Sequence, residues 1–181
     1  MSVSEYRKRQ DGTATVFDVT PAPQKKFWFI LILGGLLLIM ALSSIGSMPI
    51  FALIMAGLAA WAIWFAWFRD LRPPAHRVPS TFRVTADAIE SNGQIFKGPD
   101  IHRLIVKNGI TNDVAGIPGV MIQVPTATAA GGAHRMQVAL TANALELETG
   151  GRGYVLAGGM DETTAFGLLS DVSRIMGLST R

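Results

Sequence analysis

The alternation of apolar and polar residues divides this chain into one unbroken apolar run and a longer region of short alternating segments. The run covers residues 27–68 and contains no Asp, Glu, Lys or Arg. One helix needs about 20 apolar residues to cross a bilayer, so the run is roughly twice too long for a single straight span. Residues 43–49, near its middle, are rich in Ser and Gly and end in Pro, which is typical of a turn. The pattern therefore predicts two membrane-spanning helices, residues 27–43 and 49–68, joined by a tight turn.

A secretory signal peptide over residues 27–42 is the rival interpretation of the first apolar segment. A signal peptide has a short charged start, one apolar stretch and a cleavage site. Here 26 mostly polar residues precede the segment, and a second apolar segment follows almost at once. This layout favours a membrane hairpin that the protein retains.

Basic residues flank the apolar run and leave its central turn uncharged. Lys25 and Lys26 precede the first segment, and Arg69, Arg72 and Arg77 follow the second. Positive charge is retained on the cytoplasmic side of a membrane. We therefore expect a multi-pass protein of the bacterial inner membrane with both termini in the cytoplasm.

Three tryptophans lie where this orientation places the inner membrane interface. Trp28 opens the first segment, and Trp64 and Trp67 close the second. The indole ring is apolar but carries an N–H group that prefers water, so tryptophan is enriched at membrane surfaces. We predict that these three residues anchor the hairpin at one interface.

Small residues recur on one face of the second segment. Ala52, Ala56 and Ala60 are four positions apart, and small side chains let helix backbones approach closely in lipid. The stripe predicts packing of the hairpin on itself, and homo-oligomerisation through the same face is the alternative. Neither segment contains an ionisable residue, so the sequence indicates an anchor rather than a transport or proton pathway.

Two polar segments flank the hairpin. Residues 1–26 form a predicted cytoplasmic tail, in which the alternating residues 13–19 are either a strand docked on a later domain or part of a loose tail. Residues 69–80 hold three prolines and are predicted to be a stiff linker. Residues 81–181 then form the predicted cytoplasmic domain.

Apolar side chains alternate with polar ones from residue 81 onwards, which is the period of β-strands. The alternating apolar positions are Phe82 and Val84, then Val120, Ile122 and Val124, then Met136, Val138 and Leu140, and finally Leu145 and Leu147. The turn signals between these runs are Asn92-Gly93, Asn108-Gly109, Gly131-Gly132 and Gly150-Gly151. The pattern predicts an antiparallel meander of about six or seven short strands.

The last segment follows a helical period instead. Asp161 and Glu162 are favourable at the start of a helix, and Gly177 is favourable just after its end. The apolar residues between them that share one side are Phe166, Leu169, Val172, Ile175 and Met176. We predict a helix over residues 161–177 that covers an open end or face of the sheet.

Two segments after the hairpin resemble the bacterial membrane-anchored proteins with a pleckstrin-homology-like (PH-like) domain. Residues 82–106, which begin FRVTADAIESNG and lead to DIHRLIV, look like the opening hairpin and the next strand of these proteins. Residues 154–166, YVLAGGMDETTAF, look like their last strand and the start of their terminal helix. The resemblance implies an α+β, mainly β domain: an antiparallel, partly open barrel of two packed sheets, closed by one C-terminal helix. It implies no catalytic residues.

Composition excludes several kinds of chemistry. The 181 residues include no Cys, so disulfides and thiolate metal sites are excluded. The net charge of +3 is small and much of the excess flanks the hairpin, so it does not indicate nucleic-acid binding. His76, His102 and His134 do not stand at metal-ligand spacing. We expect no metal, no cofactor and no enzymatic activity.

One glycine-rich stretch stays open to two interpretations. Residues 126–132 are small and form either a mobile loop or a partner-binding tip. Gly131 and Gly132, with His134 and Arg135 after them, also offer N–H groups and a cation to an anion. A hairpin loop explains the two glycines more simply.

Five cations after the hairpin are candidates for contact with a partner or with the anionic inner leaflet: Lys97, Arg103, Lys107, Arg135 and Arg152. We predict a non-enzymatic scaffold or adaptor whose PH-like domain binds another membrane or cytoplasmic protein, alone or within a larger membrane assembly. An exposed sheet edge, or the groove beside the last helix, would accept a strand or peptide of that partner. The alternative is a module that senses anionic lipids through the five cations.

Overall fold

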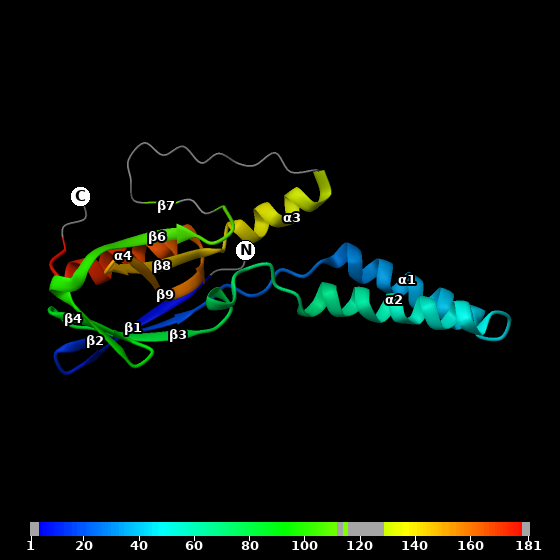
Figure 1. Ribbon diagram of the computed structural model, residues 1–181, viewed down its shortest axis with the longest axis horizontal. Coiled ribbons are helices and arrows are strands. Elements are labelled where there is room, and N and C mark those ends of the chain that lie inside the picture. Colours follow the sequence, from blue (N-terminus) through cyan, green and yellow to red (C-terminus); the bar gives the residue numbers. More distant parts are fainter. Residues whose placement is uncertain (1–3, 112–113, 116–128, 179–181) are drawn as a thin grey trace. The chain divides into compact units, whose positions relative to one another are not determined.

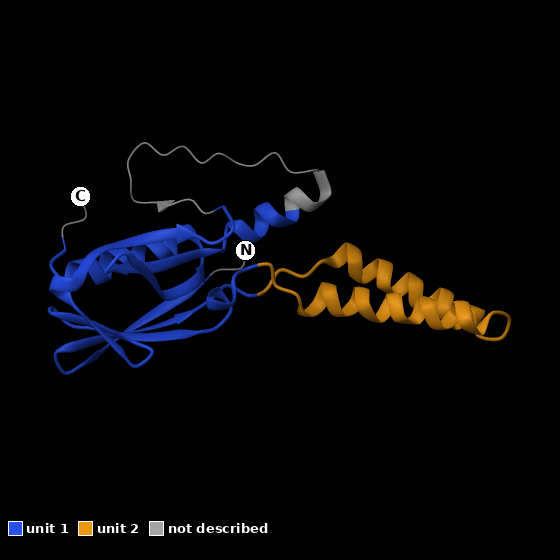
Figure 2. Ribbon diagram, viewed as in Figure 1, with its two compact units in different colours: residues 1–23, 72–181 blue, residues 24–71 orange. Residues whose placement is uncertain are grey.

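The protein is an α+β structure with two antiparallel sheets and four α-helices within the part of the chain that is described (Figure 1). A computed structural model describes residues 4–111, 114–115 and 129–178, with side chains for residues 4–111 and 134–178. The chain divides into two compact units (Figure 2). Residues 24–71 form one unit, here called the helical pair. Residues 1–23 and 72–181 form the other, here called the β domain.

The helical pair consists of α1 (Trp28–Ser44) and α2 (Pro49–Phe68). Pro49 is the first residue of α2, a position where its missing N–H costs nothing. The Phe27 N–H donates to the Ala66 carbonyl at 3.3 Å, so the start of α1 lies beside the end of α2. Among the described helices, α2 alone is long and apolar enough to cross a membrane, and α1 is apolar but has 17 residues.

The first sheet of the β domain has five strands in the order β1-β2-β3-β4-β5. They are β1 (Glu5–Asp11), β2 (Ala14–Thr20), β3 (Ser80–Val84), β4 (Ala88–Ser91) and β5 (Gln94–Lys97). Strands β1 and β2 come before the helical pair in the chain, and β3 comes after it. The sequence left open whether residues 13–19 dock on the later domain, and the structure places most of them in β2. Phe17 and Val19 explain this, because their side chains are buried in the core of the domain.

The second sheet has four strands in the order β7-β6-β8-β9. They are β6 (Ile101–Asn108), β7 (Val114–Ala115), β8 (Asn143–Thr149) and β9 (Arg152–Met160). Two short 3₁₀ helices, Pro74–His76 and Gly98–Asp100, precede β3 and β6. Over the described residues the ladders do not close into a barrel, because β1 and β5 remain the edges of one sheet and β7 and β9 the edges of the other.

Two of the predicted turns form hairpins. Asn92 and Gly93 have φ values of 52° and 76° and join β4 to β5, and Gly150 and Gly151 have φ values of 56° and 73° and join β8 to β9. A two-residue turn of this kind needs positive φ at both positions, which Asn and Gly adopt at little cost.

Helix α4 (Glu162–Ile175) closes the β domain. It packs against β6 and β8 of the second sheet and against β1 of the first (Figure 1). The predicted cap is confirmed, because the Asp161 carboxylate accepts the Thr164 N–H at 3.0 Å. The core that α4 completes contains Phe17, Val19, Phe82, Val84, Ile89, Ile101, Val106, Leu145, Leu147, Leu156, Ala157, Met160, Ala165, Leu168 and Val172.

One predicted strand is wrong. Met136 and Val138 belong to helix α3 (Ala129–Ala139), and Leu140 follows its end. Met136 and Leu140 are exposed while Val138 is buried. Residues four apart share one face of a helix, so a helix produces this alternation as well as a strand does. Gly131-Gly132 therefore lies inside α3 and not in a hairpin loop. The predicted strand at Val120, Ile122 and Val124, and residues 126–128 of the glycine-rich stretch, lie outside the described residues.

Candidate functional site

The two helices of the helical pair meet through small residues. A Cβ atom added at Gly34 would lie 2.9 Å from Ile63 Cγ1 and 3.4 Å from the Ala59 carbonyl oxygen, so α1 and α2 approach closely here. The buried residues of the two helices are Gly34, Ala41, Ala52, Ala59, Ala62 and Ala66. Close approach of this kind is how helices associate in lipid.

The predicted alanine stripe matches this packing at one position. Ala52 is buried, whereas Ala56 and Ala60 are exposed and do not belong to the contact with α1. The buried residues of α2 advance by steps of seven, three and four, which keeps them on the helix face toward α1 better than a strict step of four. The predicted residues Ala56 and Ala60 therefore lie on a neighbouring face of α2.

Aromatic and basic side chains gather at the end of the helical pair where the chain enters and leaves it. Lys26 Nζ lies 3.1 Å from the centre of the Trp67 ring, a cation–π contact. The guanidinium carbon of Arg69 lies 5.1 Å from the centre of the Phe65 ring. Trp28 is the first residue of α1 and is exposed, as are Trp64 and Trp67 of α2.

A fourth exposed tryptophan was not among the predicted interface anchors. Trp61 lies two turns before the end of α2, and its ring is 5.5 Å from the ring of Phe65. It extends the aromatic group about 9 Å along the helix from Trp67, at 1.5 Å per residue. The signal for it was its spacing of three from Trp64, which places both near one face.

The two segments that connect the β domain to the helical pair meet at β9. The Ala22 N–H donates to the Gly159 carbonyl at 2.7 Å, and Arg72 Nη1 donates to the Ala22 carbonyl at 2.7 Å. Ala22, Arg72 and His76 are all buried. We call Ala22, Arg72, His76, Gly158 and Gly159 the junction.

Glycines make room for His76 at the junction. A Cβ atom at Gly109, just after β6, would lie 2.4 Å from His76 Cε1, and one at Gly158 would lie 2.5 Å from His76 Cδ2. The imidazole ring therefore lies between two positions that admit no side chain. The sequence places His76 only in the predicted linker 69–80, because the glycines that receive its ring are more than 30 positions away.

The N-terminal strand is held to α4 by two carboxylates. Ser4 donates to Asp161 Oδ2 through its N–H at 3.1 Å and through its hydroxyl at 2.7 Å, and Thr164 Oγ1 donates to the Ser4 carbonyl at 3.2 Å. Burial acts to raise the pKa of Asp161, but the hydrogen bonds from Ser4 and Thr164 outweigh it and hold that pKa below its ordinary value.

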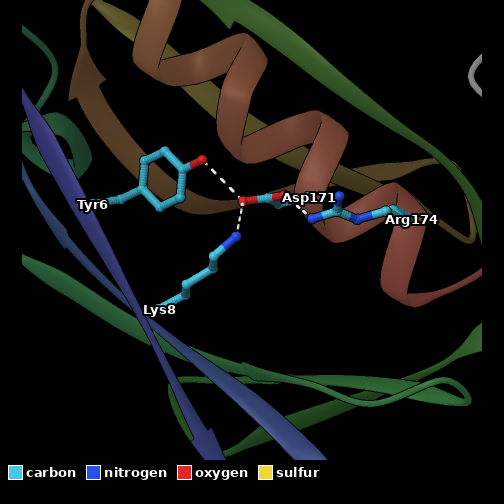
Figure 3. Close-up of polar contacts among 4 residues, drawn as sticks. All are labelled: Tyr6, Lys8, Asp171 and Arg174. Carbon is cyan, nitrogen blue, oxygen red and sulfur yellow. Dashed lines mark hydrogen bonds and ion pairs between the residues drawn. The ribbon is translucent and has the colours of Figure 1, made fainter.

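The second carboxylate, Asp171, belongs to the C-terminal part of α4 and points toward β1 (Figure 3). The Tyr6 hydroxyl donates to Asp171 Oδ2 at 3.0 Å, Lys8 Nζ donates to the same oxygen at 3.2 Å, and Arg174 pairs with Oδ1. Burial acts to raise the pKa of Asp171, but the hydrogen bonds from Tyr6 and Lys8 and the nearby positive charges lower it below its ordinary value. Burial and the bond to Asp171 also raise the pKa of Tyr6.

The five predicted cations come from four elements. Lys97 ends β5, Arg103 and Lys107 belong to β6, Arg135 to α3, and Arg152 starts β9. Arg152 and the junction lie at opposite ends of β9, about 20 Å apart at 3.3 Å per residue. Arg103 forms an ion pair with Glu148 at 2.5 Å. Their role in contact with lipid or a partner stays a prediction.

Candidate metal ligands are dispersed as well. Over the residues that the structure describes, no three His, Asp or Glu side chains come close enough to hold a metal ion. His76 is buried at the junction, His102 is exposed in β6, and His134 lies in α3. The expectation that the protein is not an enzyme stays a prediction.

Comparison with known proteins gives no relative. No family model matches the chain, and neither a curated protein nor a solved structure matches it. The resemblance to PH-like proteins stays a prediction from the sequence.

Proposed function

We propose that this chain is a membrane-anchored, non-enzymatic scaffold or adaptor. In this proposal the helical pair spans the bacterial inner membrane as a hairpin, and the β domain, of PH-like type, binds a protein partner in the cytoplasm. One observation carries the hairpin form of the anchor: strands on either side of the helical pair belong to one sheet, so the chain between them must cross a membrane an even number of times.

The pairing of β2 with β3 constrains how the chain can cross a membrane. The two strands pair along five residues, from Thr15 with Val84 to Val19 with Ser80. Paired strands lie on the same side of any bilayer, so the chain between them crosses an even number of times. If α2 spans the membrane, α1 must span it too, because a single crossing would separate β2 from β3.

The dimensions and surface of the helical pair support two crossings. At 1.5 Å per residue, α2 is about 30 Å long and α1 about 26 Å, against a hydrocarbon thickness of about 30 Å. Slight thinning of the bilayer accommodates the shorter helix. Most of the large apolar side chains of both helices are exposed, from Phe29 in α1 to Phe68 in α2. Such a surface is unfavourable in water and matches lipid.

Charge at the open end of the pair supports a cytoplasmic β domain. Lys25, Lys26 and Arg69 lie at this end, and residues 45–48 at the other end carry no charge. The positive end stays in the cytoplasm. The exposed tryptophans at the same end agree, because indole rings favour the interface.

The outer face of the five-stranded sheet supports a binding role for the β domain. Edge strand β5 exposes Ile95, which borders a shallow hollow of about 370 Å³. The hollow is lined by Asp11, Thr13, Ala14, Arg83, Thr85, Ala88, Glu90 and Ile95. An extended segment of a partner can pair with an open edge and place side chains in such a hollow.

The orientation is tested by cysteine labelling, which the absence of native Cys makes clean. Ser47→Cys, in the turn between the helices, and Ser170→Cys, on the exposed side of α4, form a matched pair. In intact cells an impermeant maleimide should label Ser47→Cys, and Ser170→Cys should react only after lysis. Labelling of Ser170→Cys in intact cells would contradict the proposal.

The partner-binding part needs a separate test. The full chain in nanodiscs should recover a stoichiometric partner, and Ile95→Arg should lose it. Gln137→Arg, which introduces the same cation at an exposed position of α3, is the control. Repeated recovery of the protein alone, or equal loss in both variants, would count against binding at β5.

A further inference from the structure

Exposed large apolar side chains of the β domain are few among the described residues, and most gather at one end. They are Val78, Ile95, Met136 and Leu140, which are 57%, 68%, 56% and 64% exposed. Ile95 belongs to edge strand β5. Val78 lies close to the junction in the sequence. Hydrogen bonds around Met136 and Leu140 place these two residues beside it.

Hydrogen bonds place α3 beside the junction. The Gly109 N–H donates to the Ala142 carbonyl at 2.9 Å, and the Asn108 side chain donates to the Ala139 carbonyl at 2.7 Å. Gly109 in turn faces the ring of His76. Leu140 lies between Ala139 and Ala142, so it belongs to the same end of the β domain.

Met136 and Val78 complete the group. The Leu140 N–H donates to the Met136 carbonyl at 3.2 Å, so Met136 lies one turn away on the same side of α3. Val78 follows the buried His76 by two residues. Arg135, next to Met136, is exposed and adds a positive charge.

A short tether keeps this end near the membrane. Arg69 follows the last residue of α2, and Arg72 is already part of the junction. Three residues reach at most about 11 Å. The headgroup region adds about 5–8 Å beyond the hydrocarbon on each side. If α2 ends at the interface, the junction end of the β domain lies within reach of the headgroups.

We infer that Val78, Arg135, Met136 and Leu140 form a lipid-contacting surface, here called the foot, that rests on the bilayer in which the helical pair is anchored. The inference rests on the proposed membrane anchor. The three apolar side chains enter the boundary between headgroups and acyl chains, and Arg135 binds the phosphate oxygens of anionic lipids. The foot holds the junction end of the β domain at the bilayer, and Arg152 lies about 20 Å from the junction along β9.

The test uses single-cysteine variants of the full chain carrying an environment-sensitive fluorophore. The variants are Met136→Cys and Leu140→Cys in the foot, with Ile95→Cys and Arg152→Cys as controls. Each is reconstituted into vesicles of phosphatidylcholine and phosphatidylglycerol with a quencher on the lipid headgroup. The two foot labels should shift to the blue and lose fluorescence, and the two control labels should not. Arg135→Glu, or vesicles without phosphatidylglycerol, should reduce the loss at Leu140→Cys.

A label at Leu38→Cys, an exposed position of α1, separates this inference from the anchor. Quenching at Leu38→Cys by an acyl-chain quencher, without quenching at Leu140→Cys, would overturn the foot alone. A Leu38→Cys label that stays in water would overturn both. Loss of fluorescence at Leu140→Cys no greater than at Ile95→Cys would also overturn the foot, as would a blue shift that needs a protein partner and not lipid.

Discussion

The helical pair and the β domain place large and small side chains in opposite ways. The helical pair buries Gly34 and a series of alanines and exposes its Leu, Ile, Phe and Trp residues. The β domain buries Phe17, Phe82, Leu145 and Leu147 and exposes polar residues. Removal of apolar surface from water stabilises the β domain. In the proposed membrane anchor, lipid solvates the large apolar side chains, so association of the two helices depends on close backbone contact.

The largest expected effect tests this contrast directly. Phe82→Ala removes a core side chain and should lower the free energy of unfolding of the β domain by about 3–5 kcal/mol. Leu38→Ala removes an exposed apolar side chain of α1 and should leave the helical pair folded in nanodiscs. Hydrogen exchange of the amides of β3 and α1 measures both. An equal loss of protection in the two variants would mean that large apolar side chains stabilise the helical pair as they stabilise the core of the β domain.

The junction should respond to an added methyl group. Gly158→Ala places a Cβ atom 2.5 Å from His76 Cδ2 and 3.1 Å from His76 Cα, so buried atoms must move. We expect a destabilisation of about 1–3 kcal/mol. The matched control in the same strand is Gly153→Ala, whose Cβ meets only the carboxylate end of Glu146 at 3.1 Å. Denaturant unfolding that does not distinguish the two variants would argue against tight packing at the junction.

The helical pair offers a matched pair of its own. Gly34→Leu inserts a side chain into the contact with Ile63 and Ala59, whereas a Cβ at Gly35 meets nothing within 4 Å. Gly34→Leu should force the helices apart and destabilise their association by about 1–3 kcal/mol. Gly35→Leu should leave it unchanged. The distance between spin labels on α1 and α2 in nanodiscs measures the separation, and a shift in the Gly35 variant alone would reverse the assigned interface.

Acid should weaken the contact between β1 and α4. The pKa of Asp171 is lower in the folded protein than its unfolded value of about 3.9, so the stability it contributes is present above about pH 4 and is lost as the pH falls through the folded value. Asp171→Asn should flatten this part of the pH dependence. Tyr6→Phe removes one hydrogen bond and should cost about 0.5–1.5 kcal/mol at neutral pH. Unfolding followed from pH 7 to pH 2 checks both, with the exposed Asp100→Asn as control.

Local signals in the sequence predicted the elements whose causes are local. The charge-free run gave α1 and α2, Asn92-Gly93 and Gly150-Gly151 gave two hairpins, and Asp161 gave the start of α4. Each depends on a few neighbouring residues or on a single period. The membrane and partner assignments stay proposals because they concern molecules outside the chain.

Contacts between distant residues were not predictable in the same way. Strand β1, EYRKRQD, looks like a solvated polar segment, and its Tyr6 and Lys8 become informative only beside Asp171, more than 160 positions away. Met136 and Val138 fit a period of two as well as a helix, because so few positions cannot separate the two periods. Arg72 and His76 gained their roles from glycines that are distant in the sequence, in β9 and just after β6.

The helical pair interrupts the connection between two neighbouring strands, and the ends of the interruption touch each other. Ala22 and Arg72 share a hydrogen bond of 2.7 Å across the point where residues 24–71 depart. A sheet built this way needs only a short loop between β2 and β3. A chain in which a few Gly and Ser residues replace residues 24–71 should therefore fold in water without detergent, which makes the helical pair an excisable insertion.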